Sequence, residues 1–570
     1  MASLMKKTLF LAICFVCFIH FGATYTLVPG LSLPTNGVVP PRLELRVFTQ
    51  NSTRLNILYL ALERMQTTST NQPLSFYQIG GIHGTNFAWD NDTNGGGSIN
   101  YGYCRHADRL FPTWHRPYLS LYEKTLYDLA TQIVAEFPMG TQKNRHLGVL
   151  STWRLPYWDW ASNPSIPSVL GSTQNVSVTK MVNGRLTRVT IPNPLFSYRF
   201  QILNDVNTVV TPGSIQTTQT VRNPIVQNGT YVTQASFTNN QMIQWGPSLK
   251  ASVRLALSIN TSYNAFSNMQ DDGNSIEGVH GFVHSIVGGN GGHMGRIEFA
   301  GFDPLFYFHH ANIDRLIALW QAINPNSYLS SNTANSPNEN TELYPFRINA
   351  TQYWTSKLAR NVTAFGYTYP ELIGATPQSI IAAINSLYGQ LPSTGRRRKR
   401  TVTADNVEED QNKLRISRNA VFTTYNEYVI LITVSNGAAN GPFRVYCFFG
   451  KPRTQEANYH KDPNLVGFLG IFAAKDLPVK HRKLLKGNIP LTTTIYELHK
   501  SGVLPDLTPY TISGYLKDNL KWRIVGDDCE SYDMTGFEID VVTAEVCVPC
   551  NNEELPTWTP FSSLFRITDI

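Results

Sequence analysis

The chain has 570 residues, of which 42% are hydrophobic and 12% aromatic, and its formal net charge is +7. This apolar content excludes a disordered chain, and the ordinary glycine and proline counts of 40 and 33 exclude collagen-like and low-complexity classes. Seven cysteines are too few for a disulfide scaffold of this length. At about 100–200 residues per domain, the length indicates more than one domain.

The first 24 residues have the layout of a secretory signal peptide. Lys6 and Lys7 precede a short apolar stretch that ends in small residues near Ala23. The stretch is shorter than the roughly 20 residues of a membrane-spanning helix, and an uncleaved anchor is the alternative interpretation. We expect a secreted protein without a membrane attachment once residues 1–24 are removed. Asn-x-Ser/Thr glycosylation acceptors support this route, and all of them lie before residue 362: Asn51, Asn91, Asn175, Asn228, Asn260, Asn349 and Asn361.

The segment 25–390 is predicted to form a mainly α-helical domain. Apolar residues recur there at three- and four-residue intervals, which is the period of a helix with one buried face. Loops rich in Gly, Asn, Ser and Thr separate these stretches. The helices that we expect span 55–63, 118–130, 277–287 and 303–323.

Residues 391–420 form a polar linker that contains five consecutive basic residues, Arg396 to Arg400. This run is either a solvated loop or a cleavage site for a kexin-type protease of the secretory route, which would be an activating partner. Together with Lys6 and Lys7, the run accounts for the whole net charge of +7. We therefore expect neither nucleic acid nor membrane lipid as a partner of the folded domains.

The segment 421–570 is predicted to form a β-rich C-terminal domain. Its apolar runs are short and rich in β-branched and aromatic residues, and turn-like Asn-Gly pairs follow the first of them. The strands that we expect span 428–434, 443–449, 521–525 and 537–541. The two domains are expected to join near the basic run.

Three histidines in the second half of the first domain are candidate metal ligands. His280 and His284 are one helical turn apart, so both imidazoles project from one helix face, and Glu277 lies one turn earlier on the same stripe. His310 lies in the first turns of the last helix. Asp314 follows His310 by one turn, where we expect it to orient the imidazole.

A second histidine set lies earlier in the chain. His115 opens a helix, and His106 precedes it by nine residues, so both cannot point the same way from one straight helix. Pro112 would also interrupt such a helix. His106 is therefore expected to reach in from a loop, restrained by Cys104 two residues before it, and His83 is a further loop histidine. Two sets of imidazoles without a ligating carboxylate favour copper over magnesium, calcium, non-haem iron and most hydrolytic zinc sites.

These residues resemble the copper signatures of the tyrosinase or polyphenol oxidase family. The first signature comprises His106, Phe111, Trp114, His115, Arg116 and Glu123, and the second comprises Asp303, Pro304, Phe306, His310 and Asp314. The resemblance covers roughly residues 45–390. The strand-rich C-terminal region with its late Cys-x-x-Cys is similar to that of fungal tyrosinases.

The resemblance implies a type-3 centre of two copper ions in a four-helix bundle. One ion would be bound by His83, His106 and His115, and the other by His280, His284 and His310. Cys104 and His106 would form the thioether cross-link of the family. His309 and Ile297 would lie beside the metals without binding them, with Ile297 as a small gate residue.

The implied activity is O2-dependent oxidation of small phenols, in which monophenols are hydroxylated and o-diphenols become o-quinones. Glu277 would correspond to the carboxylate that holds a water near the second copper, although a charge favoured by the helix dipole is the simpler interpretation. Many strongly hydroxylating tyrosinases have Asn where this chain has Gly281. The alternatives are therefore a catechol oxidase without significant monophenolase activity, or a haemocyanin-like oxygen carrier.

Two expectations concern the C-terminal domain. Cys547 and Cys550 form either a redox pair, a structural disulfide or, by the fungal resemblance, a pair that delivers copper to the site. The same resemblance implies that an aromatic side chain of this domain plugs the active site of a latent precursor. Our candidate for the plug is Phe537, which precedes Cys547 by ten residues.

Overall fold

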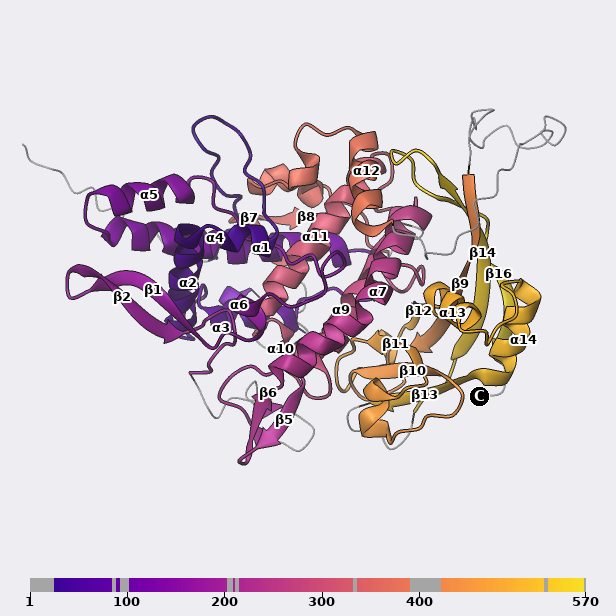
Figure 1. Ribbon diagram of the computed structural model, residues 1–570. Coiled ribbons are helices and arrows are strands. Elements are labelled where there is room, and N and C mark those ends of the chain that lie inside the picture. Colours follow the sequence, from indigo (N-terminus) through magenta and orange to yellow (C-terminus); the bar gives the residue numbers. More distant parts are fainter. Residues whose placement is uncertain are drawn as a thin grey trace, which may run out of the picture.

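The computed structural model describes residues 25–84, 89–92, 102–201, 209–210, 215–331, 336–389, 422–526 and 532–567. The signal segment 1–24 and the basic run at 396–400 lie outside the described residues. The ribbon shows a helical domain followed by a strand-rich domain, which lies against helices α7 and α9 (Figure 1). The mainly α first domain and the β-rich second domain confirm the predicted fold class.

Twelve helices are described in the first domain. Their bounds are α1 Leu45–Thr49, α2 Ser52–Thr67, α3 Phe76–Gly84, α4 Phe111–Glu136, α5 Thr141–Leu150, α6 Ser168–Gly171, α7 Ala235–Ile259, α8 Tyr263–Ser267, α9 Ile276–Gly288, α10 Ile297–Ala300, α11 Leu305–Ile323 and α12 Pro377–Tyr388. The four predicted helices correspond to α2, α4, α9 and α11. The 25-residue helix α7 was not predicted, because Pro247 and its preceding Gly246 look like a helix break in the sequence.

Short antiparallel hairpins accompany the helices. They are β1 Asn175–Val182 with β2 Arg185–Pro192, β3 Val209–Val210 with β4 Ile215–Gln216, β5 Pro224–Gln227 with β6 Thr230–Thr233, and β7 Glu342–Asn349 with β8 Gln352–Thr355. The core between the helices is dense in aromatic side chains. Trp114, Trp158 and Trp320 are each fully buried there.

Local signals explain where the central helices begin. Pro112 occupies the first turn of α4, where no hydrogen-bond donor is needed. The Ser275 hydroxyl accepts a hydrogen bond from the Gly278 N–H and caps α9. The Asp303 carboxylate accepts a hydrogen bond from the Leu305 N–H at 2.9 Å just before α11 begins. These starts set the phase at which the histidines of each helix face inward.

The C-terminal domain packs two antiparallel sheets around one core. The strands are β9 Phe422–Ser435, β10 Phe443–Phe449, β11 Leu465–Ile471, β12 Leu484–Pro490, β13 Leu520–Gly526, β14 Glu538–Pro549, β15 Thr557–Trp558 and β16 Ser562–Ile567, with helices α13 Thr492–Lys500 and α14 Pro509–Asn519. One sheet has the order β11-β10-β13, and the other has β12-β9-β14-β15 with β16 also on β14. All four predicted strands are present, whereas β11, β12, β15 and β16 were not predicted.

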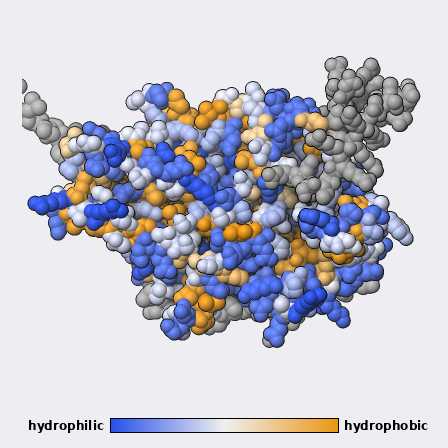
Figure 2. Space-filling view, in the orientation of Figure 1, coloured by the Kyte–Doolittle hydropathy of each residue, from blue (hydrophilic) through white to orange (hydrophobic). Residues whose placement is uncertain are grey.

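Hydrophilic and hydrophobic residues are interspersed over the side of the protein that Figure 2 shows. In the described part of the chain, no helix is both long enough and apolar enough to cross a bilayer.

Candidate metal centre

Two groups of histidines, all of them buried except the partly buried His106, lie close together on the helical domain where it faces the C-terminal domain. Within each group, the available ligand atoms lie within 4.8 Å of one another. The first group contains His83 from α3, His106 from the loop before α4, and His115 from α4. The second contains His280 and His284 from α9 and His309 and His310 from α11. The structure therefore brings together all six predicted ligands, and it places His83 on a helix rather than in a loop.

The first group presents three imidazole nitrogens without a partner. His83 Nδ1 and His115 Nδ1 lie 2.8 Å from the carbonyl oxygens of Ile297 and Phe111, so each Nδ1 donates and each Nε2 keeps its lone pair. His106 Nδ1 lies 3.2 Å from the Cys104 sulfur. The Nε2 atoms of all three histidines are buried and have no hydrogen-bond partner among the described residues. Such orphaned atoms are costly unless a ligand satisfies them.

The second group has the geometry of three ligands around one ion. His310 Nε2 lies 3.2 Å from His280 Nε2 and 3.3 Å from His284 Nε2. Imidazole nitrogens about 2.0–2.1 Å from one tetrahedral ion would be separated by about 3.3 Å. His284 Nδ1 donates to the Met294 carbonyl at 2.6 Å, which directs its Nε2 lone pair to the same point.

The two groups form one dinuclear arrangement. The rings of His115 and His310 stack with centroids 4.6 Å apart, and those of His106 and His280 stack at 5.6 Å. Each of these pairs joins the first group to the second. The rings of His280 and His309 stack at 5.3 Å, and both nitrogens of His309 are unpartnered among the described residues. His309 therefore packs against a predicted ligand within the same group, and its place outside the ligand set stays a prediction.

Burial keeps these imidazoles neutral. It lowers the pKa of His83 to about 4 and that of His284 to about 3. Burial, reinforced by neighbouring histidines, also holds the pKa values of His106, His115 and His310 well below the ordinary value of 6.5. A metal requires the neutral form of imidazole, so the site is ready to bind near neutral pH without first releasing protons.

Asp314 does not orient His310, so that expectation was wrong. Its carboxylate accepts hydrogen bonds from Arg116 at 2.6 Å and from the hydroxyls of Tyr367 and Tyr369 at 2.6 Å each, with Arg42 at 3.3 Å. The buried guanidinium groups attract the carboxylate more strongly than a neutral imidazole can. Burial opposes ionisation, but Arg116 and then Arg42 lower the pKa of Asp314 below its ordinary value. The network ties α4 to α11 behind the histidines.

Glu277 bonds to backbone beside the first group. Its carboxylate oxygens accept hydrogen bonds from the Ala107 N–H at 2.6 Å and the Met269 N–H at 2.9 Å. Ala107 follows His106 directly and has a left-handed φ of 49°, so Glu277 holds the loop that carries this histidine. Burial raises the pKa of Glu277 to about 7.

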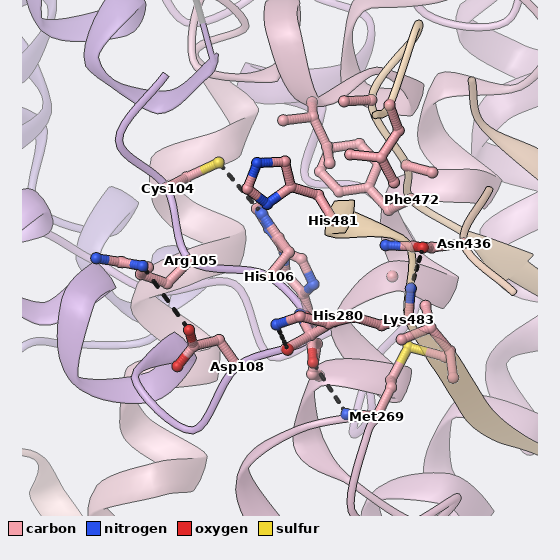
Figure 3. Close-up of a pocket in the computed structure, with 18 of the residues that line it drawn as sticks. Cys104, Arg105, His106, Asp108, Met269, His280, Asn436, Phe472, His481 and Lys483 are labelled. Atoms are coloured by element: carbon pink, nitrogen blue, oxygen red, sulfur yellow. Dashed lines mark hydrogen bonds and ion pairs between the residues drawn. The ribbon is translucent and has the colours of Figure 1, made fainter. Parts of the chain in front are cut away.

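A cavity of about 340 Å³ lies between the two domains at the histidines. Gly281 and Ile297 line it from the helical domain, next to His106 and His280. Figure 3 shows Cys104, His106 and His280 facing Phe472, Asn436 and Lys483 of the C-terminal domain across this space. The cavity is therefore lined by residues that come from both domains.

The aromatic side chain over the histidines is Phe472, and the expectation for Phe537 was wrong. Phe472 follows β11, and its ring stacks on His284 with centroids 4.4 Å apart. It also lies 5.4 Å from the His106 ring and 6.0 Å from the His280 ring. Phe537 is only 4% exposed and packs on Trp522 in the core of the C-terminal domain. Sequence spacing gave no signal for Phe472, because the preceding strand β11 was itself not recognised.

Cys547 and Cys550 lie at the opposite end of the C-terminal sheet. Glu538 pairs with Thr433 near the cavity end of β9, whereas Cys547 pairs with Thr424. Nine residues of strand at about 3.3 Å each separate these positions by roughly 30 Å. The structure therefore does not bring the two cysteines to the histidines. It instead brings Lys483, which the sequence did not single out, to 2.7 Å from the Ala107 carbonyl.

Known proteins resemble this chain in both sequence and fold. The model of the common central domain of tyrosinase matches residues 73–323, and that of the tyrosinase C-terminal domain matches residues 427–541. A tyrosinase of Podospora anserina is 35% identical over 62% of this chain and 67% of the relative. A tyrosinase of Neurospora crassa is 28% identical over 93% of this chain and 96% of the relative.

A solved structure of recombinant mushroom tyrosinase, abPPO4, superposes with a TM-score of 0.75 at 24% identity, covering 94% of this chain and 97% of that chain. This match concerns the fold, whereas the sequence relatives and the two domain models concern the family. The chain belongs to the tyrosinase family of type-3 copper oxidases.

Proposed function

We propose that this protein is a secreted, latent copper phenol oxidase that converts o-diphenols to o-quinones faster than it hydroxylates monophenols. The observation that carries the proposal is the set of six converging, buried and neutral imidazoles. Family membership supports copper as the metal and O2 and phenols as the reactants.

The residues present fit two copper ions. His83, His106 and His115 would hold one ion through their orphaned Nε2 atoms. His280, His284 and His310 would hold the other, because the separations of their Nε2 atoms suit one shared ion. When bound, the copper pair supplies the activation of O2 and the oxidation of the phenol.

The protein contributes orientation, exclusion of water and a proton site. Carbonyl oxygens of Ile297, Phe111 and Met294 fix three imidazole orientations by accepting from Nδ1. Glu277 lines the cavity, and its pKa of about 7 suits a group that accepts a phenolic proton near neutral pH. Each of its oxygens has a second lone pair besides the one used by the backbone N–H.

The preference for o-diphenols rests on Gly281. This residue lines the cavity one position after His280 but has no side chain with which to hold a water or direct a phenolic hydroxyl. Catechols lose their first proton more readily and need no hydroxylation step, so they depend less on such help. The test compares the rates on tyrosine and on its catechol analogue, using the active enzyme. Comparable rates would contradict the preference.

A haemocyanin-like oxygen carrier is the second candidate, because Phe472 covers the histidines as a shielded carrier site would require. Oxygen consumption with a simple catechol separates the two functions. A carrier binds O2 reversibly and consumes none, with or without the C-terminal domain in place. An oxidase consumes O2 continuously once its cavity is open.

A further inference from the structure

We propose that the C-terminal domain stays docked as a non-covalent subunit after the linker between the domains is cut, so that linker cleavage alone leaves the site closed. The inference rests on the proposed phenol oxidase function and concerns the regulation of its site. The surface involved is the face of α7, α9 and α12, and its occupant is this chain's own segment 422–567.

The first argument is that the two domains share a hydrophobic core. Tyr446, Phe448 and Phe468 of the C-terminal domain belong to the same buried cluster as the core of the helical domain. Phe468 packs against Phe282 of α9 and Trp245 of α7, with ring centroids 4.9 and 5.4 Å apart. Interfaces that resemble a domain core cut in half are typical of permanent complexes.

The second argument is a buried ion pair across the interface. Arg254 of α7 donates to the Glu427 carboxylate of β9 at 2.6 Å and to the Tyr425 hydroxyl at 2.8 Å. The Thr492 hydroxyl donates to the other Glu427 oxygen at 2.7 Å. Separating the domains would remove the partner of a cation that is itself nearly buried, in addition to exposing the apolar surface around it.

The third argument is that side chains and backbone of the C-terminal domain also bind backbone carbonyls of the helical domain near the histidines. Arg444 donates to the Ser285 and Gly289 carbonyls at 3.2 and 2.6 Å and so satisfies the carboxyl end of α9. Lys483 donates to the Ala107 carbonyl beside His106 at 2.7 Å. The Lys486 N–H donates to the Met269 carbonyl at 2.7 Å. These bonds are distributed along the docked face rather than gathered near the linker.

A close approach of α9 and β11 offers a way to break the docking. A Cβ atom at Gly470 would lie 1.9 Å from the Ser285 hydroxyl oxygen and 2.7 Å from the Ser285 Cβ. Alanine at position 470 therefore cannot be accommodated unless β11 or α9 moves. Gly514 on α14 is a matched control in the same domain, because a Cβ atom there meets nothing within 4 Å.

The linker contributes to docking only by keeping the two domains close to each other. A covalent connection raises the effective concentration of one domain near the other to the order of millimolar. Cutting it removes this contribution but breaks none of the contacts above. Activation would then need a second event, such as digestion or dissociation of the C-terminal domain.

The experiment uses the copper-loaded full chain with a specific protease site in place of Arg396–Arg400. After complete cleavage, size-exclusion chromatography at micromolar concentration reports whether the fragments travel together, and oxygen uptake with catechol reports closure. We expect wild type and Gly514→Ala to co-elute with uptake unchanged within about twofold, and cleaved Gly470→Ala to separate with uptake raised at least about tenfold.

Separation of the wild-type fragments on cleavage would overturn the proposal, as would full activity in a co-eluting complex. Co-elution does not depend on the chemistry. The proposed oxidase function can fail independently. If the wild-type fragments co-elute, the Gly470→Ala fragments separate and neither protein consumes O2, the docking proposal stands and the proposed oxidase function is wrong.

Discussion

The ring of Phe472 lies on the ring of His284 with an interplanar angle of 23° and centroids 4.4 Å apart. This contact joins a residue that follows a strand of the C-terminal domain to a predicted copper ligand of the helical domain. Closure of the site therefore depends on aromatic packing, held in place by the docked domain. The space that a phenol ring would need over the second histidine group is taken by the ring of the protein itself.

Copper content should follow the histidine assignment. His310→Ala is expected to lower bound copper from two ions to one per chain, because it removes the nitrogen that lies 3.2 and 3.3 Å from its two partners. Metal analysis after gel filtration measures this. His146→Ala replaces a buried histidine that packs on Phe137, away from both groups, and should retain both ions. Full copper content in His310→Ala would contradict the assignment.

Glu277 should make the stability of the metal-free protein depend on pH. Its pKa is about 7 in the folded chain against an ordinary 4.5, so between these values the native state holds a proton that the unfolded state lacks. The contribution of Glu277 to stability should therefore fall by up to about 3 kcal/mol as pH rises through this window. The buried histidines act in the opposite direction, because their pKa values lie below the ordinary 6.5 and they must gain protons on unfolding, so total stability should still rise with pH up to about 6.5. Thermal unfolding of chelator-treated protein from pH 4.5 to 7 measures the slope.

In the same assay Glu277→Gln should remove the opposing contribution of Glu277, so its stability should rise with pH more steeply than that of wild type. It should also lower stability by about 1–3 kcal/mol at all pH values, because an amide N–H₂ would face a backbone donor. An unchanged slope in Glu277→Gln would assign the pH dependence to other groups.

Cys104 and His106 should become covalently linked in the copper-loaded protein. The Cys104 sulfur lies 3.2 Å from His106 Nδ1, within reach of the imidazole ring. Formation of the thioether removes one hydrogen from the thiol and one from a ring carbon, and O2 accepts both with their electrons. Peptide mapping should find a cross-linked fragment lighter by two hydrogens and no alkylatable thiol at Cys104. Protein that was never exposed to copper is the control and should retain that thiol.

Asp314 should be a structural requirement for the site. Asp314→Asn removes the negative charge that Arg116 and Arg42 share, while both guanidinium groups stay buried. Removing one partner of a buried ion pair costs about 3–5 kcal/mol. We expect a loss of this order in unfolding free energy, together with weaker copper retention. Asp128→Asn, which breaks a more exposed pair with Lys124, should cost no more than about 0.5 kcal/mol. Equal effects of the two substitutions would contradict the network.

Local patterns predicted the clustering of the histidines, because these residues lie within helical turns or short motifs. His280 and His284 share a helix face by their spacing alone, and Cys104 fixes the neighbourhood of His106 within two residues. The helix α7 was not predicted, because burial against α9 and the C-terminal domain stabilises a segment that contains Gly246 and Pro247.

Features that depend on long-range contacts could not be predicted. Phe472 contacts His284 although it lies 188 positions further along the chain. Asp314 binds Arg116 and Arg42 instead of His310, which lies one turn earlier on the same helix. Asn260 illustrates the same point, since its acceptor motif is intact but its side chain is only 7% exposed and donates to the Asn274 carbonyl. We expect this acceptor to stay unglycosylated.

Oxygen uptake by the uncut, copper-loaded chain with catechol tests the central claim most directly. Phe472→Ala should open the cavity and raise uptake at least about tenfold over wild type, a change worth about 1.4 kcal/mol in apparent barrier. Phe565→Ala, which removes another partly buried ring of the same domain, should stay silent, as should Phe472→Ala without copper. No uptake by copper-loaded Phe472→Ala would contradict an oxidase that is closed by this ring.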